Sequence, residues 1–486
     1  MLLIKQVQIV DGSGAKPFFG DILMSGPKIV AIGKNISKKK AETVIDGLGL
    51  VAVPGFIDAN NDSDHHLSLF TNPGQKDFIS QGITSIIGGQ CGASLAPLMY
   101  GSLASIGQWV NADKVNVDWM SVRELRQVLA RIGLGVNFET LVGYSTIRRD
   151  LAGIEIRDLT DSEIKIFISI LEQALRDGAL GLSTGLGFLD SKFVPYSEIK
   201  KIVSAVGKMN KVYTTHLRDE KDGLLQSIEE TLMLSRETGT KTVISHFRPL
   251  KGYEKIFSEA LSLIEKSLVD SNIYFDINPF TATIFPIHTY LPYWAQSERT
   301  EIMLENIKDP EKRKLIIKEL RDSNLQELVV SDARGQEYLV GKSLLELSQN
   351  REKDIVSVVL EIMESTKMKT MFMSKSLNID LLLPLLTHSR SLIGSNSASL
   401  PPSKQGKELK LERAFSTFAK YLEIVLSQGI PMESAIKKIT SFPAQLFGLK
   451  DRGLIKEGFI ADIVLLKGSE VSNVIVNGRI QGKNLS

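Results

Sequence analysis

The chain has 486 residues, 43% of them hydrophobic and 23% charged, a globular composition long enough for two or three folding units that argues against disorder and fibrous repeats. Its 58 basic and 56 acidic residues leave a net charge of +2, which provides no electrostatic footprint for nucleic acid or an anionic membrane. Because the single cysteine, Cys91, excludes an intrachain disulfide and no run of about 18 apolar residues occurs, we expect a cytoplasmic protein without nucleic-acid or membrane partners.

Both ends of the chain are predicted to be β-structured. In residues 1–54, turn residues separate five short strand-like runs: Ile4–Val10, Gly20–Met24, Lys28–Ile32, Ala41–Asp46 and Leu50–Val53. Residues 448–486 repeat this texture with two runs, Asp462–Leu466 and Val471–Val476, followed by the hairpin signal Asn477-Gly478. Because a different pattern lies between the two ends, we expect one small β-sandwich that both termini complete.

Residues 55–447 alternate strand-like and helical patterns. Eight apolar runs are expected as strands: Gly55–Asp58, Ile83–Gly88, Phe138–Gly143, Leu180–Ser183, Val212–His216, Thr242–His246, Ile273–Ile277 and Ser391–Gly394. Helical patterns such as Ile164–Arg176 lie between most of them, which favours an α/β fold of the (β/α)8 TIM-barrel type over an open sheet. A charged helical stretch at about 297–350 is predicted to be an insertion that covers the active site.

Three reactive residues stand at equivalent strand ends of this predicted barrel. Cys91 follows the second strand, His216 ends the fifth and His246 ends the sixth. Barrel enzymes place their active sites at these carboxyl ends. One thiolate and two imidazoles make three zinc ligands and leave a fourth position for water, as in catalytic zinc sites. The alternative is a buried free cysteine with two hydrogen-bonded core histidines.

Several motifs along the chain resemble one family. They include Pro54-Gly-Phe-Ile-Asp58, Gln90-Cys-Gly-Ala-Ser94, Gly178-Ala-Leu-Gly-Leu-Ser-Thr-Gly185, His216-Leu-Arg-Asp-Glu220, Ile244-Ser-His246 and Gly458-Phe-Ile-Ala-Asp-Ile-Val464. Together they resemble the D-aminoacylase (N-acyl-D-amino-acid deacylase) family of the amidohydrolase superfamily. The similarity covers nearly the whole chain and implies a metal-dependent barrel with a small β-sandwich. It also implies that Cys91, His216 and His246 hold one Zn²⁺ per chain.

Two positions depart from the family pattern. Where the family has His-x-His after the first strand, this chain has Asn60-Asn61-Asp62, so a second metal would depend on the Asp62 carboxylate. Where the family has an aspartate that orients and deprotonates the catalytic water, this chain has Asn396. An amide can orient a water but cannot accept its proton at neutral pH. Asp62 and Asp64 are therefore the candidates for a replacement base.

The resemblance also implies a set of substrate-binding residues. Arg413 and Arg248 occupy the positions of basic residues expected to hold the substrate carboxylate, which a guanidinium can bind through two hydrogen bonds. Tyr144 stands where a histidine is common, and Asn278 stands where relatives have a tyrosine. These two changes are expected to alter the preference for the acyl group and the amino acid.

We therefore expect a metal-dependent amide hydrolase that acts on N-acyl-D-amino acids or related N-acyl compounds by zinc-activated water. In this hypothesis Asn396 orients the water. The alternative is a weak or catalytically silent binding or regulatory protein that keeps the barrel and one metal site. The substitutions at Asn60, Asp62 and Asn396 are the features that favour this alternative.

Overall fold

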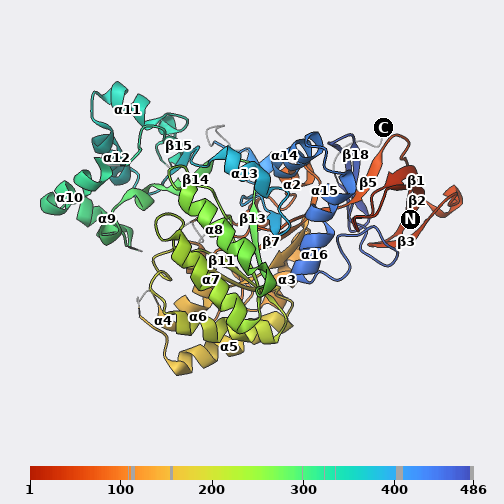
Figure 1. Cartoon of the computed structure of the whole chain (residues 1–486), viewed down its shortest axis with the longest axis horizontal. Helices are drawn as coiled ribbons and strands as arrows, with labels where there is room; N and C mark the ends of the chain where they lie inside the picture. Colours follow the sequence, from red (N-terminus) through yellow and green to blue (C-terminus); the bar gives the residue numbers. More distant parts are fainter. Residues whose placement is uncertain are drawn as a thin grey trace.

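The computed structural model describes residues 1–107, 109–110, 115–153, 157–297, 299–321, 323–333, 335–400 and 409–481. Figure 1 shows three parts: a central barrel, a β-sheet unit that carries both labelled ends of the chain, and a helical insertion at the opposite end. Among the helices of these described ranges, none has the length and apolar character that a membrane span requires.

Strands from both ends of the chain build the sheet unit. Its strands are β1 (Leu2–Ile9), β2 (Phe18–Ser25), β3 (Lys28–Gly33), β4 (Thr43–Asp46), β5 (Val51–Pro54), β18 (Ile463–Lys467), β19 (Glu470–Val476) and β20 (Arg479–Gln481). They follow the order β20-β19-β18-β5-β1-β2-β3, with β4 as a branch on β1. The antiparallel pairing of β5 with β18 joins the two ends. Ile4 and Ile22 share a buried core with Ile463 and Ile475, so the two termini form one unit as expected.

The barrel strands run parallel in chain order. They are β6 (Phe56–Asp58), β7 (Ile83–Gly88), β8 (Asn137–Thr140) continued as β9 (Val142–Gly143), β10 (Gly181–Gly185), β11 (Val212–His216), β12 (Lys241–Ile244), β13 (Ile273–Ile277) and β17 (Ser391–Ile393). Backbone hydrogen bonds from Leu180 N to Thr140 O (2.9 Å) and from Ala59 N to Ile393 O (3.2 Å) link the two parallel sheets. With β8 and β9 counted as one, eight strand positions follow one another, which confirms the (β/α)8 prediction.

Amphipathic helices cover the outside of the strands (Figure 1). They are α1 (Ser68–Thr71), α2 (Lys76–Ile79), α3 (Val122–Ile132), α4 (Tyr144–Ala152), α5 (Asp161–Arg176), α6 (Tyr196–Lys208), α7 (Leu224–Thr238), α8 (Glu254–Lys266), α13 (Ile379–Leu385), α14 (Arg413–Ser427), α15 (Met432–Ile439) and α16 (Ser441–Phe447). Helix α5 shows the local logic, because Thr160 and Glu163 form a capping box at its start and Phe167 and Leu171 lie on its buried face.

The insertion between the seventh and eighth strand positions is longer than predicted. It contains β14 (Thr283–Pro286), β15 (Val329–Ala333), β16 (Thr370–Ser374), α9 (Thr300–Lys308), α10 (Pro310–Arg321), α11 (Leu344–Arg351) and α12 (Ile355–Ser365). Strand β16 pairs with both β14 and β15, so strands outside the predicted bounds of about 297–350 close the unit. Ile316, Val359 and Phe372 belong to a hydrophobic core of its own, which makes it a small subdomain.

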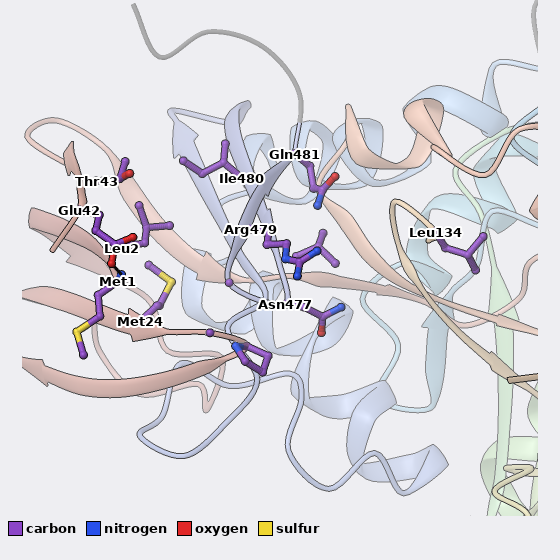
Figure 2. Close-up of a pocket in the computed structure, with 14 residues that line it drawn as sticks. Met1, Leu2, Met24, Glu42, Thr43, Leu134, Asn477, Arg479, Ile480 and Gln481 are labelled. Atoms are coloured by element: carbon purple, nitrogen blue, oxygen red, sulfur yellow. Dashed lines mark ion pairs between the residues drawn. The ribbon is translucent and has the colours of Figure 1, made fainter. Parts of the chain in front are cut away.

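A cavity of about 580 Å³ lies in the terminal sheet unit, away from the barrel strand ends. Figure 2 shows Met1, Leu2 and Met24 on one side of it, and Ile480 and Gln481 on the other. None of the residues that line it is a predicted site residue. We therefore place the functional site in the barrel.

Candidate metal centre and active site

Three predicted metal ligands converge at the carboxyl ends of the barrel strands. The Cys91 Sγ lies 3.9 Å from His216 Nδ1 and 3.6 Å from His246 Nε2. All three donor atoms lie within 4.8 Å of one another, and within the described ranges this is the only such group of histidine, cysteine or acidic residues. Residues from β7, β11 and β12 thus meet at one point, although the chain separates Cys91 from His246 by 155 positions.

The loop that carries Cys91 is held by buried hydrogen bonds. Gly89 N donates to Asp64 Oδ2 (2.6 Å), and Ser183 Oγ both donates to Gly89 O (2.5 Å) and accepts from Gly92 N (3.1 Å). Gly89 has φ +71°, and a Cβ there would lie 2.2 Å from Leu141 O, so only glycine fits. These contacts assign Ser183 and Asp64 to the support of the loop.

Three site residues have a left-handed backbone although none is glycine. The φ angles are 51° at Cys91, 41° at His246 and 45° at Asn396. Such conformations cost free energy and persist where the surroundings enforce them, often at functional sites. Here they occur immediately after β7, β12 and β17, at the strand ends where site residues are expected.

The protonation states of the ligands depend on burial and nearby charge. Burial and the neighbouring His246 lower the pKa of His216 to about 3, so its imidazole is neutral and can act as a ligand. Burial, Asp62 and Asp276 raise the pKa of the Cys91 thiol well above its usual range. A bound divalent cation reverses this effect because a coordinating thiol is deprotonated. The donor set therefore fits a zinc ion.

Glu220 was not predicted as a site residue, yet it joins two of the predicted ones. Its Oε1 accepts a hydrogen bond from His246 Nδ1 at 3.1 Å, and its Oε2 pairs with Arg248. A carboxylate on Nδ1 fixes the ring orientation and leaves Nε2, the atom that faces Cys91, for a metal. The signal was present, because Glu220 closes the His216-Leu-Arg-Asp-Glu220 motif, but its partner is 26 residues away.

The first and eighth strand positions carry an amide network. Asn60 Nδ2 donates to both oxygens of Asp276 at 3.1 Å, and the backbone N–H of His246 donates to Asp276 Oδ1 at 3.0 Å. Burial raises the pKa of Asp276 to about 6. The backbone N–H of Asn396 donates to Asn60 O at 2.8 Å, so the backbone of Asn396 lies beside this network, and the residue is half-buried. The sequence predictions did not include Asp276.

The two candidate bases have different surroundings. Asp62 has a side chain 14% exposed, and its Oδ1 lies 3.4 Å from His65 Nδ1. Burial would raise the pKa of Asp62, but the hydrogen bond and charge of His65 lower it, so the carboxylate is ionised. Asp64 is fully buried and bonded to Gly89, and burial raises its pKa. Asp62 is therefore the better placed of the two to receive a proton.

Two of the four predicted substrate-binding side chains are basic and close together. Arg413, at the start of α14, is 9% exposed, and its buried Nε has no hydrogen-bond partner among the described residues. Burial lowers the pKa of Arg413 to about 10, with Asp62 and Arg248 as its charged neighbours. Asn278 lies directly after β13 and is nearly buried.

Tyr144 does not reach this site. Its hydroxyl donates to Glu198 of α6, and its ring packs against Phe167 of α5 with 5.4 Å between centroids. The side chain is completely buried between the strands and the outer helices. The expectation that Tyr144 contacts substrate is corrected here, because helix α4 begins at this residue and directs it to the outer layer.

Known proteins resemble the chain over nearly its full length. The Amidohydrolase family model matches residues 373–482. An N-acyl-D-aspartate deacylase of Alcaligenes xylosoxydans xylosoxydans is 26% identical over 476 residues, which is 97% of this chain and 86% of that protein. A D-aminoacylase of the same organism is 27% identical over 478 residues, covering 97% and 89%.

A solved structure has the same fold. The N-acyl-D-glutamate deacylase of Bordetella bronchiseptica, in complex with zinc and a phosphonate inhibitor, superposes with a TM-score of 0.80. It is 21% identical, and the match covers 99% of this chain and 96% of that one. These comparisons support the resemblance of the chain to the D-aminoacylase family of the amidohydrolase superfamily.

The similarity to these deacylases, together with the Amidohydrolase family match, supports a hydrolase that acts on amide bonds. A D-aminoacylase structure that is 24% identical, with a TM-score of 0.80 over 100% of this chain and 98% of that one, is described with a binuclear metal centre. Metal binding thus occurs among the relatives, and the clustered donors equip this chain for a metal cofactor. The relatives do not favour the alternative of a silent binding protein.

Proposed function

We propose that the protein hydrolyses N-acyl-D-amino acids or closely related N-acyl compounds with one zinc ion held by Cys91, His216 and His246. The observation that carries this proposal is the convergence of these three donors within 4.8 Å of one another, beside two arginines. A thiolate and two imidazoles suit zinc, and a site with only three protein ligands is open for catalysis. The named relatives act on substrates of this class, which supports the choice.

The zinc ion would supply Lewis-acid polarisation of the scissile carbonyl and lower the pKa of a water molecule. The protein's own residues would do the rest. Arg413 and Arg248 would bind the substrate carboxylate, since the buried Nε of Arg413 has no hydrogen-bond partner among the described residues. Glu220 holds Arg248 by an ion pair and also binds His246, so it fixes the carboxylate-binding group relative to a metal ligand.

Proton transfer is assigned to Asp62. It is ionised, partly exposed and electrostatically coupled to Cys91 and Arg413. Asp62 would accept the proton of the attacking water and pass it to the nitrogen of the departing amine, so that a free carboxylate and an amino acid result. Asn396 would orient the water by hydrogen bonding, because its amide cannot take the proton.

We further propose that the protein binds one metal ion. The position that the resemblance assigned to a histidine is Asn60, whose amide nitrogen is occupied by both oxygens of Asp276. The Asp62 carboxylate follows the first strand, and its Oδ1 lies 3.4 Å from His65 Nδ1. Among the described residues, no second group of three metal donors accompanies the Cys91 group.

Elemental analysis combined with substrate screening tests the proposal. Protein purified without chelators or a histidine tag should contain about one zinc per chain, and Cys91→Ala should contain none. The same preparation should release amino acids from a panel of N-acyl-D compounds, read by an amine-reactive dye, with matched N-acyl-L compounds as the comparison. A chain with no bound metal would overturn the proposal. A metal-loaded chain that cleaves no N-acyl compound would overturn the assigned reaction.

A further inference from the structure

His65 is a buried histidine that has no role in the proposed reaction as described so far. The residue is 1% exposed, and its Nδ1 lies 3.4 Å from Asp62 Oδ1. Its other ring nitrogen, Nε2, lies 3.1 Å from the carbonyl oxygen of Ala93. Because a carbonyl oxygen only accepts hydrogen bonds, Nε2 carries a proton, and the Asp62 carboxylate attracts a second proton to Nδ1. These contacts favour a charged imidazolium between two oxygen atoms.

Two further neighbours stabilise the charge on His65. Its ring stacks on Trp109 with 4.3 Å between centroids and 15° between planes, and the face of an indole ring attracts a cation. Burial would lower the pKa of His65, but the charges of Asp64 and Asp62 raise it to about 9. His65 is therefore positively charged at neutral pH although it is buried.

Backbone hydrogen bonds fix the place of Asp62 in the chain. Its N–H donates to Ser397 O at 2.9 Å, one residue after Asn396, and its carbonyl oxygen accepts from His66 N at 3.1 Å. These two bonds hold the backbone of Asp62 beside the loop that follows the eighth strand. They do not set the direction of the side chain, and the carboxylate is instead paired with His65.

From these contacts we propose that His65 is a positioning residue, which holds the Asp62 carboxylate in the orientation that accepts the proton of the attacking water. The inference rests on the proposed function, because it requires Asp62 to be the base. A general base must lie within hydrogen-bond reach of the proton that it accepts, so its orientation affects the rate. His65 itself exchanges no proton in this role and keeps one on each nitrogen.

The pairing is specific to the segment in which this chain departs from the family pattern. Where the resemblance places His-x-His, the chain has Asn60-Asn61-Asp62, and His65 follows Asp62 by three residues. A carboxylate at this position is buried with 14% of its side chain exposed, so it requires a partner charge. His65 provides that charge from the same turn.

The test is a double-mutant cycle between the two residues. His65→Gln removes the charge and keeps an amide that can donate to Ala93 O. It should lower kcat by about 10-fold through misorientation of the base, while KM and zinc content stay at the wild-type values. Asp62→Asn should lose about 10²-fold, and His65→Gln added to it should cause no further loss, because His65 acts through Asp62.

His66→Gln is the matched control, because it makes the same change at the next position. The backbone N–H of His66, which bonds to Asp62 O, is kept in this variant, so kcat should stay near the wild-type value. A wild-type kcat in His65→Gln would overturn the inference. A further loss of about 10-fold in the double variant would overturn it too, since His65 would then act as a structural support independent of Asp62.

Histidine NMR decides the case in which His65→Gln does not fold or no substrate is cleaved. Nitrogen-labelled, zinc-loaded wild type at neutral pH should show one imidazolium with both nitrogens protonated, which persists in His66→Gln and is lost or weakened in Asp62→Asn. In a chain that cleaves no N-acyl compound, this result supports the pairing of His65 with Asp62 and rejects the reaction alone. A neutral His65 overturns the inference in either case.

Discussion

The two sides of the barrel mouth differ in chemistry. On one side, Cys91, His216 and His246 gather soft and borderline donors, and Glu220 supports His246 from outside. On the other side, the first and eighth strand positions present Asn60 and Asn396, and the first of these amides is spent on Asp276. The side chains on the first side can bind a cation, whereas the amide side chains on the second side can form hydrogen bonds.

The hydrogen-bonding side occupies the positions where the family resemblance places further metal and base residues. The Asn60 side chain pairs with a buried carboxylate that also accepts the backbone N–H of His246. The amide nitrogen of Asn60 thus partners a buried carboxylate, whereas the amide oxygen of Asn60 is buried without a hydrogen-bond partner among the described residues. The proton-accepting role moves to Asp62, an expectation that the following variants test.

The largest effect is expected from the cation-binding side. His246→Ala should remove bound zinc and lower kcat/KM by at least about 10³-fold, since metal polarisation contributes several kcal/mol and each 1.36 kcal/mol is a factor of ten. Elemental analysis and initial rates measure both. His288→Ala is the control, because His288 lies in the insertion. Metal retained in His246→Ala would remove this residue from the ligand set.

The next effect concerns the proposed base. Asp62→Asn should lower kcat by about 10²-fold, the lower end for a lost general base, while zinc content stays at the wild-type value. Asp150→Asn is a suitable control, since Asp150 lies in α4 and accepts a hydrogen bond from Met99 N. An unchanged kcat would place the base elsewhere. Loss of zinc would instead make Asp62 a ligand.

Glu220→Gln is expected to weaken metal binding without abolishing it. A neutral amide still accepts from His246 Nδ1 but no longer pairs with Arg248 as an ion, so zinc affinity should fall by about 10- to 100-fold. Competition with a chromogenic chelator measures it. The matched control is Glu230→Gln. Glu230 lies in the nearby helix α7, and this substitution removes its ion pair with Arg218. Equal zinc affinity in both variants would contradict the role of Glu220.

The smallest effect is a gain on the hydrogen-bonding side. Asn396→Asp should raise kcat by about 10-fold, because it adds a carboxylate where the family resemblance assigns the base. In the Asp62→Asn background it should restore most of the lost rate, as a single base is sufficient. Steady-state rates at constant zinc content provide the measurement. No gain in either background would mean that position 396 does not face the reacting water.

The barrel strands could be predicted because buried parallel strands have a local signature. All eight predicted runs overlap strands of the structure, from Gly55–Asp58 to Ser391–Gly394, since apolar runs bounded by turns and amphipathic helices determine them. The insertion was predicted at the correct place, between the seventh and eighth strands, but its predicted range of about 297–350 is shorter than the observed subdomain. Strand β14 pairs with β16, although helices α9–α12 and strand β15 lie between them in the chain, and no local pattern marks such a distant pairing.

The same division holds for the site. Cys91, His216 and His246 could be chosen from the sequence, because rare reactive residues at strand ends are recognisable one by one. The roles of Glu220 and Asp276 and the position of the Tyr144 side chain could not be predicted from the sequence. Each depends on a hydrogen-bond partner from a distant segment.

The sequence by itself determined the barrel order, the union of the two termini and the three candidate metal donors, because these follow from hydrophobic periodicity and from residue chemistry at strand ends. The tertiary structure decided which polar groups satisfy one another: Asn60 with Asp276, Glu220 with His246, and Tyr144 with Glu198. The physical reason is that a buried polar atom must find a partner in space, and its choice among distant segments is fixed only when they pack together.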